Sequence, residues 1–297
     1  MMSIQATTQG SDDAVKSFES AYKAYQRNKR TFNITFLVVF ALCFVLSIVS
    51  TEFDIVTLIG GFPRTRDFLF RLVPPITYDE FALDVLDWYW NIEVWMDNLL
   101  NTLLMAFLAT LLGTLFGGAL SFFAAQNLVK HYATYWITRR ILEIARTVPD
   151  VVWALIFVLT FGVGPMAGVL AITIHTIGAQ GKLFAEVNEN ISWHPIEGVR
   201  ATGGNWFQEI RFAVLPQVMP NFVSYTFWRI ELNVRSATIV GFVGAGGIGH
   251  DLFIAIQLLE FPDVGAILLI VVTTIMLIDI ASEKLRHYLV GKEALKR

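Results

Sequence analysis

Charged residues are scarce in this sequence. Only 16% of its 297 residues are Asp, Glu, Lys or Arg, whereas 55% are hydrophobic and the mean hydropathy is +0.57. A soluble domain usually has about 25% charged and about 45 to 50% apolar residues. The scarcity of charge therefore argues against an ordinary soluble protein and predicts a membrane protein. The net charge of −3 is too small to indicate a nucleic-acid partner.

Several kinds of chemical site are also missing. The one cysteine, Cys43, stands within an apolar run, so an intrachain disulfide is impossible, and the five histidines are too scattered for a metal site. The stretch GAQGKLF at 178–184 lacks the first glycine and the hydroxyl residue of a G-x4-G-K-[ST] motif, and H-E-x-x-H and G-x-S-x-G are absent. The sequence therefore predicts no cofactor in this chain and argues against an intramembrane enzyme.

Long apolar runs are what the sequence does contain. Residues 31–51 carry no charge and follow a stretch that ends in basic residues, which predicts a first membrane span entering from a cytoplasmic tail, 1–30. The alternative is a cleaved signal peptide, whose apolar core is typically only about 7 to 15 residues long. Residues 52–97 hold few basic residues and several tryptophans, so we expect an external segment that lies partly at the membrane interface.

The remaining apolar runs form the expected transmembrane core, residues 98–281. We expect its spans at about 98–125, 147–161, 166–181, 217–240 and 264–281. A tight turn at 162–165 and a cytoplasmic loop at 182–216 connect them. This topology places most Lys and Arg on the cytoplasmic side, including those of a C-terminal tail, 282–297. The sequence therefore predicts an all-α polytopic membrane protein with about six transmembrane helices and both termini in the cytoplasm.

A helix-turn-helix pattern lies within the expected cytoplasmic loop, at EGVRATGGNWFQEIRFAVLP, residues 197–216. Pro195 can open the first helix, and Gly203 suits the left-handed position after its end. Asn205, with a glutamine three residues later, resembles a capping box for the second helix, and Pro216 marks the expected boundary with the next span. Such a unit has no hydrophobic core of its own, so we expect a soluble partner to hold it.

This pattern resembles the cytoplasmic signature E-A-A-x3-G-x9-I-x-L-P of the inner-membrane permeases of ATP-binding-cassette importers. The positions that match it without a gap are Glu197, Gly203, Leu215 and Pro216. Gly198 and Val199 replace the two alanines and Ala213 replaces the isoleucine, and all three are small or apolar. The resemblance implies a type I importer permease fold and a coupling helix that docks on an ATPase subunit. An ordinary interhelical loop is the alternative.

The resemblance extends to a phosphonate-type subgroup of these permeases. That subgroup has a Glu-x-Asn-x-Arg-x-Ala run before a glycine-rich GFVGAGGIG, and both elements occur here. The first places Glu231, Asn233 and Arg235 in the apolar run 217–240. The glycines of the second are Gly241, Gly244, Gly246, Gly247 and Gly249. Phosphonate or a related small oxyanion is the implied cargo. Related importers of methionine and quaternary amines have a similar glycine stretch, which leaves another small solute as the alternative.

The family also implies partners and a location. A permease of this kind lies in the cell inner membrane, among lipid, as a dimer that we expect to be a homodimer. It binds two ATPase subunits, which hold ATP and Mg, and receives cargo from an external binding protein. An ion-coupled secondary transporter is the less favoured alternative, because the inverted repeats often found in such proteins are not visible between the two halves of the sequence.

Charged residues within the expected fifth span need an explanation. An ionisable group there costs at least about 2.5 to 3.5 kcal/mol unless it is paired or hydrated. Glu231 and Arg235 are four residues apart and can form a structural ion pair. Arg229 and Asn233 fall on another face, and we expect Arg229 on or near the translocation path, where a cation would attract an oxyanion. His175 is interpreted as an interhelical histidine rather than a proton relay.

The glycines at 244, 246 and 249 also spell G-x-G-x-x-G, with Asp263 about twenty residues beyond the first. A dinucleotide-binding turn needs a preceding strand, a following helix and then a second strand that carries the acid. Here a charged apolar helix precedes the glycines and another span follows them. We therefore predict a backbone bend near the external end of the fifth span, where the glycines form a gate or pack closely against a neighbouring helix.

Overall fold

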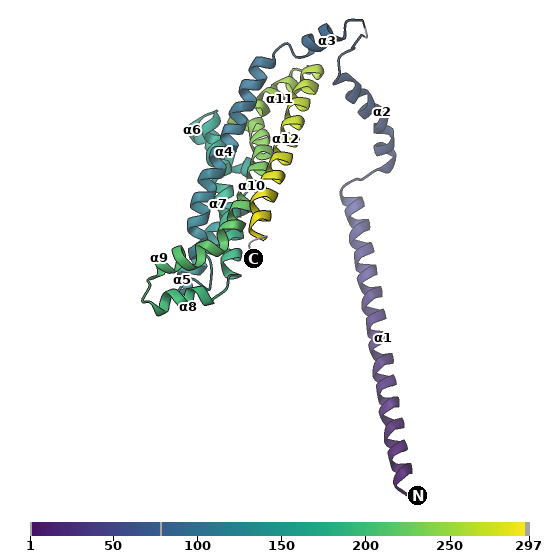
Figure 1. The fold of residues 1–297 in the computed structure, drawn as a ribbon. Coiled ribbons are helices and arrows are strands. Elements are labelled where there is room, and N and C mark those ends of the chain that lie inside the picture. Colours follow the sequence, from purple (N-terminus) through teal and green to yellow (C-terminus); the bar gives the residue numbers. More distant parts are fainter. Residues whose placement is uncertain (1, 78, 295–297) are drawn as a thin grey trace. The chain divides into compact units, whose positions relative to one another are not determined.

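The computed structural model describes residues 2–77 and 79–294, and within these ranges the secondary structure is helical, without strands (Figure 1). The expected all-α fold is therefore confirmed. Residue 1 of the expected N-terminal tail, residue 78 of the expected external segment and residues 295–297 of the expected C-terminal tail lie outside the described residues. The chain divides into two compact units, Met1–Asp67 and Phe68–Arg297.

The first unit is formed by two helices, α1 (Met2–Ser50) and most of α2 (Ile55–Arg71). The stretch Ala21–Ser50 of α1 is long and apolar enough to cross a membrane, and it contains nearly all of the expected first span. The helix also extends back through most of the expected tail, 1–30. The second unit begins at Phe68, so it includes the later part of the segment that we expected to be external.

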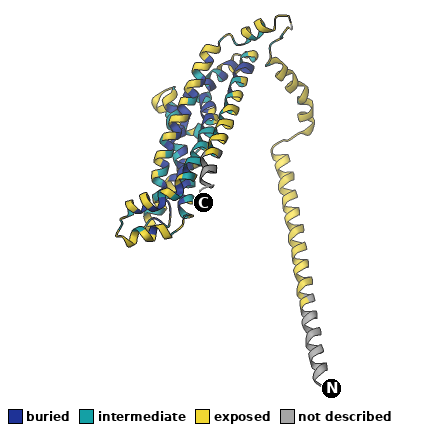
Figure 2. Ribbon diagram, in the orientation of Figure 1, coloured by how far each residue is buried: buried dark blue, intermediate teal, exposed yellow. Residues whose placement is uncertain are grey.

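The helices of the second unit include two short π-helical turns, η1 and η2. In chain order they are α3 (Phe81–Trp88), α4 (Ile92–Phe123), α5 (Tyr132–Thr147), α6 (Asp150–Phe161), α7 (Pro165–Glu189), α8 (His194–Ala201), α9 (Trp206–Glu209), η1 (Ile210–Val214), α10 (Leu215–Val240), η2 (Gly241–Ala245), α11 (Ile248–Gln257) and α12 (Phe261–Ala294). Helices α4, α7 and α10 pack together as the centre of a bundle. Buried residues follow the inside of this bundle and exposed ones its outer surface (Figure 2). The exposed residues include many large hydrophobic side chains, as expected of a surface that meets lipid.

Small residues allow the central helices to approach closely. A Cβ atom at Gly117 of α4 would lie 3.0 Å from the carbonyl oxygen of Ile177 in α7. On another side of α7, a Cβ atom at Gly178 would lie 2.5 Å from the backbone nitrogen of Arg146 in α5. The stretch GAQGKLF therefore belongs to a continuous helix, where its glycines serve helix packing rather than phosphate binding.

Among the described residues, three helices are long and apolar enough to span a membrane, and up to five spans result if two bent helix pairs each count as one. The pairs are α5 with α6, bent by 86°, and Trp206–Ala245 with α11, bent by 58°. Helix α7 is not among them; it contains the polar residues His175 and Gln180. The expected number of six spans and the expected segment boundaries remain predictions.

The later part of the expected external segment is tied to the start of α12. The indole Nε1 of Trp88 donates a hydrogen bond to the carbonyl oxygen of Pro262 at 2.7 Å. The indole of Trp90 donates to both carboxylate oxygens of Asp263 at 3.3 Å. Asp263 thus has a structural role as an acceptor, in a region without the strands that a dinucleotide site requires.

Candidate functional site

Within the expected coupling loop, 182–216, the helix-turn-helix of residues 194–216 forms the coupling segment, and it has the predicted local conformation. Pro195 lies in the first turn of α8, and Gly203, beyond its end, has a φ of 82°. The Asn205 side chain accepts a hydrogen bond from the backbone N–H of Gln208 at 3.1 Å, and the Gln208 side chain accepts one from the backbone N–H of Asn205 at 2.7 Å. The predicted capping box is therefore confirmed.

An ion pair that the sequence did not reveal joins the two helices of this turn. The guanidinium of Arg200 in α8 donates from Nε and Nη2 to the carboxylate of Glu209 in α9, at 2.7 and 3.0 Å. Glu209 is buried, and the Arg200 guanidinium also lies 4.9 Å from the ring centre of Trp193. The hydrogen bond to Glu209 raises the pKa of Arg200. The two residues are nine positions apart across a turn, whereas helix spacing predicts contacts only between residues three or four positions apart.

The segment also shares a hydrophobic core with the rest of the bundle. Ile196, Ile210 and Val214 are buried in one cluster with Phe184 of α7. The indole of Trp206 donates a hydrogen bond to the carbonyl oxygen of Leu128 at 2.8 Å. These contacts join the segment to the bundle, so a displacement of the segment can be transmitted to the transmembrane helices.

The signature residues differ in their exposure. Glu197, Gly203 and Pro216 are exposed, whereas Leu215 is half-buried. Helix α10 begins at Leu215, next to the expected boundary at Pro216, although α9, η1 and α10 follow one another without a break. Proline has no N–H to donate, but it lies in the first turn of α10, immediately after the π-helical turn η1, and there it does not end the helix.

Asn233 is a fully buried polar residue of α10. Its side-chain amide donates to the hydroxyl oxygens of Thr110 in α4 at 2.8 Å and Thr176 in α7 at 3.0 Å. Asn233 is fully buried, so it joins the three central helices from inside the bundle, and a role on the translocation path remains a prediction. Arg229, one turn earlier in α10, is half-buried and donates to the same Thr176 hydroxyl at 3.4 Å. Of these two residues, only Arg229 is accessible from outside the bundle.

Glu231 and Arg235 form the ion pair that their spacing predicts, between Oε1 of the carboxylate and Nη2 of the guanidinium. The Arg235 side chain is 45% exposed and that of Glu231 14%. The charges of Asp279 and Arg286 in α12 also act on Glu231. The pair thus lies at the surface of the bundle, away from the contact that joins Arg229 to Thr176.

The glycines form the predicted bend. Gly244, Gly246 and Gly247 have φ values of 94°, 77° and 73°, conformations that L side chains rarely adopt. The backbone N–H of Gly164, in the turn before α7, donates to the carbonyl oxygen of Gly244 at 2.9 Å. A Cβ atom at Gly246 would lie 3.6 Å from the ring of Pro165. The bend therefore packs against the start of α7.

The far side of the bend is packed against the chain before it and against α4. A Cβ atom at Gly241 would lie 2.8 Å from the carbonyl oxygen of Gly246, and one at Gly249 would clash with the carbonyl oxygen of Thr238. The hydroxyl of Thr102 in α4 accepts a hydrogen bond from the backbone N–H of Ile248 at 2.9 Å. The space for a side chain is thus already filled by backbone atoms, and a gating role for these glycines remains a prediction.

Comparison with known proteins places this arrangement in a family. The family model of the binding-protein-dependent transport system inner membrane component matches residues 117–292, more than half of the chain. The chain belongs to this family. It is therefore a transport permease of the inner membrane, as the coupling-segment pattern predicted.

Two relatives are named for the ion that they transport. The phosphite transport system permease protein PtxC of Stutzerimonas stutzeri is 33% identical over 255 residues, which are 86% of this chain and 87% of that protein. The phosphate-import permease protein PhnE of Mycolicibacterium smegmatis is 34% identical over 244 residues, 81% of this chain but only 44% of that longer protein. Both alignments extend well beyond the coupling segment.

The fold is shared with a solved importer. An inward-facing structure of the MetNI methionine ABC transporter contains a chain that matches with a TM-score of 0.57, at 19% identity, over 67% of this chain and 97% of that one. At this identity the likeness concerns the fold alone. The expected type I importer permease fold is confirmed.

Proposed function

We propose that this permease belongs to an ATP-driven importer of phosphite, phosphonate or another small oxyanion. The observation that carries the proposal is the 33% identity to the phosphite permease over 86% of the chain. The half-buried cation of Arg229 supports it, because a small anion that crosses a membrane span gains from a positive charge. Methionine or a quaternary amine is the alternative cargo.

The ATPase is proposed to be a separate subunit, present twice, which binds ATP and Mg. Its docking site on this chain is the coupling segment, with Glu197 and Gly203 on the exposed side of the turn. A second copy of this chain completes the permease, and an external binding protein delivers the cargo. In this arrangement both termini lie in the cytoplasm.

ATP binding is proposed to favour one of two packings of the helices. The coupling segment is well suited to transmit that change, because Ile196 and Val214 share a cluster with Phe184 of α7. Closure of the ATPase subunits draws the two coupling segments together and opens the helices outward, and hydrolysis resets them. The thermodynamic requirement is only that ATP binds one packing more tightly than the other.

Reconstitution tests the proposal. The permease, its ATPase and its binding protein are assembled in proteoliposomes and offered phosphite, methylphosphonate, phosphate, methionine or glycine betaine. We expect ATP-dependent uptake of one or more of the oxyanions and none of the two amine compounds. Uptake driven by an ion gradient without the ATPase would instead identify a secondary transporter.

Arg229→Gln tests the proposed role of the half-buried cation. We expect a lower rate of oxyanion uptake and a changed concentration dependence, while assembly with the ATPase is kept. Arg140→Gln is the matched control, because it removes an exposed charge whose contacts with Glu143 and the Trp136 ring both lie within α5. Equal uptake by both variants would show that Arg229 does not lie on the translocation path.

A further inference from the structure

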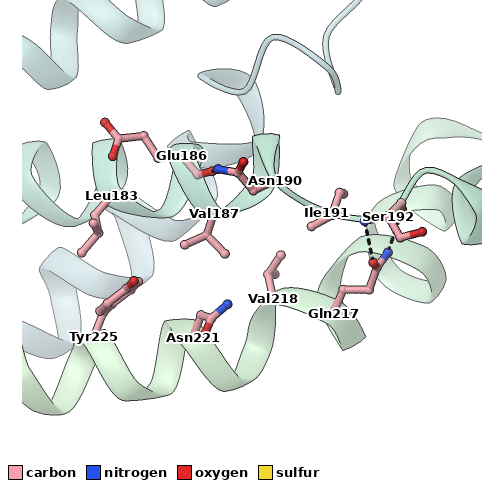
Figure 3. A pocket seen from close by; sticks show the side chains of 10 residues that line it. All are labelled: Leu183, Glu186, Val187, Asn190, Ile191, Ser192, Gln217, Val218, Asn221 and Tyr225. Carbon is pink, nitrogen blue, oxygen red and sulfur yellow. Dashed lines mark hydrogen bonds between the residues drawn. The ribbon is translucent and has the colours of Figure 1, made fainter. Parts of the chain in front are cut away.

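A polar groove with a volume of about 590 Å³ lies between the C-terminal half of α7 and the first half of α10 (Figure 3). Its polar lining residues are Glu186, Asn190, Ser192, Gln217, Asn221 and Tyr225. In Figure 3, Asn221 and Tyr225 point from α10 toward α7 across the groove. The groove adjoins the coupling segment in the sequence on both sides, since Ser192 precedes α8 and Gln217 follows η1.

One end of the groove is fixed by hydrogen bonds, and the rest is open. The side-chain amide of Gln217 accepts from the backbone N–H of Ser192 at 3.0 Å and donates to its carbonyl oxygen at 3.2 Å. Among the described residues, by contrast, the side chains of Asn221 and Tyr225 form no hydrogen bond. An amide and a phenol hydroxyl are therefore presented to whatever fills the groove.

The polar residues of α10 continue from the groove toward the interior of the bundle. Gln217, Asn221, Tyr225 and Arg229 recur at every fourth position, so each is a neighbour of the next on the helix surface. Four residues advance about 6 Å along a helix axis, which places Arg229 one step beyond the end of the groove. Polar groups in such a line are costly in lipid and are expected only against protein or water.

The charge of the groove differs from that of Arg229, which lies one step beyond its inner end. The lining contains no Lys or Arg, and its one charged residue is the acid Glu186, which is exposed. Neutral donors beside a carboxylate can solvate a small anion but attract it much less than Arg229 would. An anion that moves from Arg229 into the groove would therefore lose attraction as it approaches the coupling segment.

We propose that this groove is the inward exit of the translocation path, a water-filled, low-affinity site for the oxyanion after it leaves Arg229. This inference rests on the proposed function. The neutral side chains of Asn221 and Tyr225 replace part of the hydration of the anion, and Glu186 opposes its return.

Cysteine labelling tests the exit. Cys43, which is exposed, is replaced by serine, and Tyr225→Cys is introduced in that background. A negatively charged, membrane-impermeant thiol reagent is added from the ATPase side of inside-out vesicles that contain the assembled importer. We expect labelling of Tyr225→Cys without nucleotide, and labelling slower by roughly tenfold with ATP and vanadate, because the closed packing shuts the exit.

Leu115→Cys is the control for depth. Gln180 donates to the carbonyl oxygen of Tyr225 and accepts from the hydroxyl of Thr114, so position 115 of α4 lies close to the level of Tyr225. Leu115 is 66% exposed on the apolar outer surface of the chain, where lipid or protein excludes the charged reagent. We expect no labelling there in either state.

Asn221→Cys provides a second test if Tyr225→Cys does not assemble. Its control is Met219→Cys, which lies about 200° away around the helix and is 46% exposed. Labelling of position 221 but not 219 supports the exit. If the groove positions stay unlabelled while the Cys43→Ser parent imports an oxyanion, the groove is covered and the inference is wrong. If that parent imports no oxyanion, the proposed function itself fails.

Kinetics supply an independent readout. Glu186→Lys places a cation at the rim of the groove and should retain the anion. We expect kcat and KM for oxyanion uptake both to fall, by about two- to fivefold, which is the size of an exposed charge interaction. An unchanged kcat would show that release does not pass Glu186.

Discussion

The coupling segment and the glycine bend both depend on glycines with positive φ, but they are held in different ways. At Gly203 a Cβ atom would meet nothing within 4 Å, and the turn is fixed by neighbours such as Asn205 and Gln208. At Gly249 of α11, which directly follows the positive-φ glycines of the bend, the same atom would clash with the carbonyl oxygen of Thr238. The first region is therefore determined by local backbone conformation and the second by the close approach of backbone segments.

The difference predicts distinct kinds of failure. A substitution in the turn alters only the shape of a segment that is exposed on one side, so the bundle should still fold. A substitution in the bend displaces the start of α7 or of α11, which are parts of the bundle core. Coupling and folding can thus be disrupted separately, and four variants in order of decreasing effect test this.

Gly249→Ala should have the largest effect. The added methyl group has no space beside Thr238, and overpacking of this kind costs about 1 to 3 kcal/mol or more. We expect a large loss of folded protein, measured as monodisperse yield and thermal stability in detergent. Gly118→Ala is the control, because its Cβ atom would make only ordinary contact, 3.8 Å from the ring of Phe184. Equal yields of the two variants would show that the bend is not tightly packed.

Gly203→Val should abolish uptake while the protein still folds. A β-branched residue at a φ of 82° costs about 1 to 3 kcal/mol, so the turn should adopt another shape. We expect ATPase activity that no longer responds to cargo, measured beside uptake in proteoliposomes. Gly198→Ala, within α8 and without neighbours in reach of its Cβ atom, should leave both activities intact. Normal coupled transport by Gly203→Val would refute the proposed role of the turn.

Sequence spacing could predict the turn but not what surrounds it. The capping box of Asn205 and the Glu231–Arg235 pair were predictable because they join residues three and four apart on a helix. The contact of Asn233 with Thr110 joins residues far apart in the chain, and it depends on how whole helices pack. The identity of the helix beside the bend was unpredictable for the same reason, although the bend itself followed from the glycines.

Arg200→Gln should have a moderate effect. Loss of its two hydrogen bonds leaves the buried carboxylate of Glu209 without its cation, at a cost of about 1 to 2 kcal/mol after allowance for the exposure of Arg200. We expect a lower melting temperature and weaker coupling. The double variant with Glu209→Gln should be more stable than the sum of the two single changes predicts. Strict additivity would show that the pair is not coupled.

Asn205→Ala should have the smallest effect, because a lost cap costs about 1 kcal/mol and α9 is also held by the bond from Trp206 to Leu128. We expect nearly normal uptake but faster amide hydrogen exchange at Gln208, whose N–H loses its acceptor. Gln208→Ala should instead expose the N–H of Asn205. Faster exchange confined to α9 would show that the turn is held locally, whereas faster exchange that reached α7 would show that the two regions are held together after all.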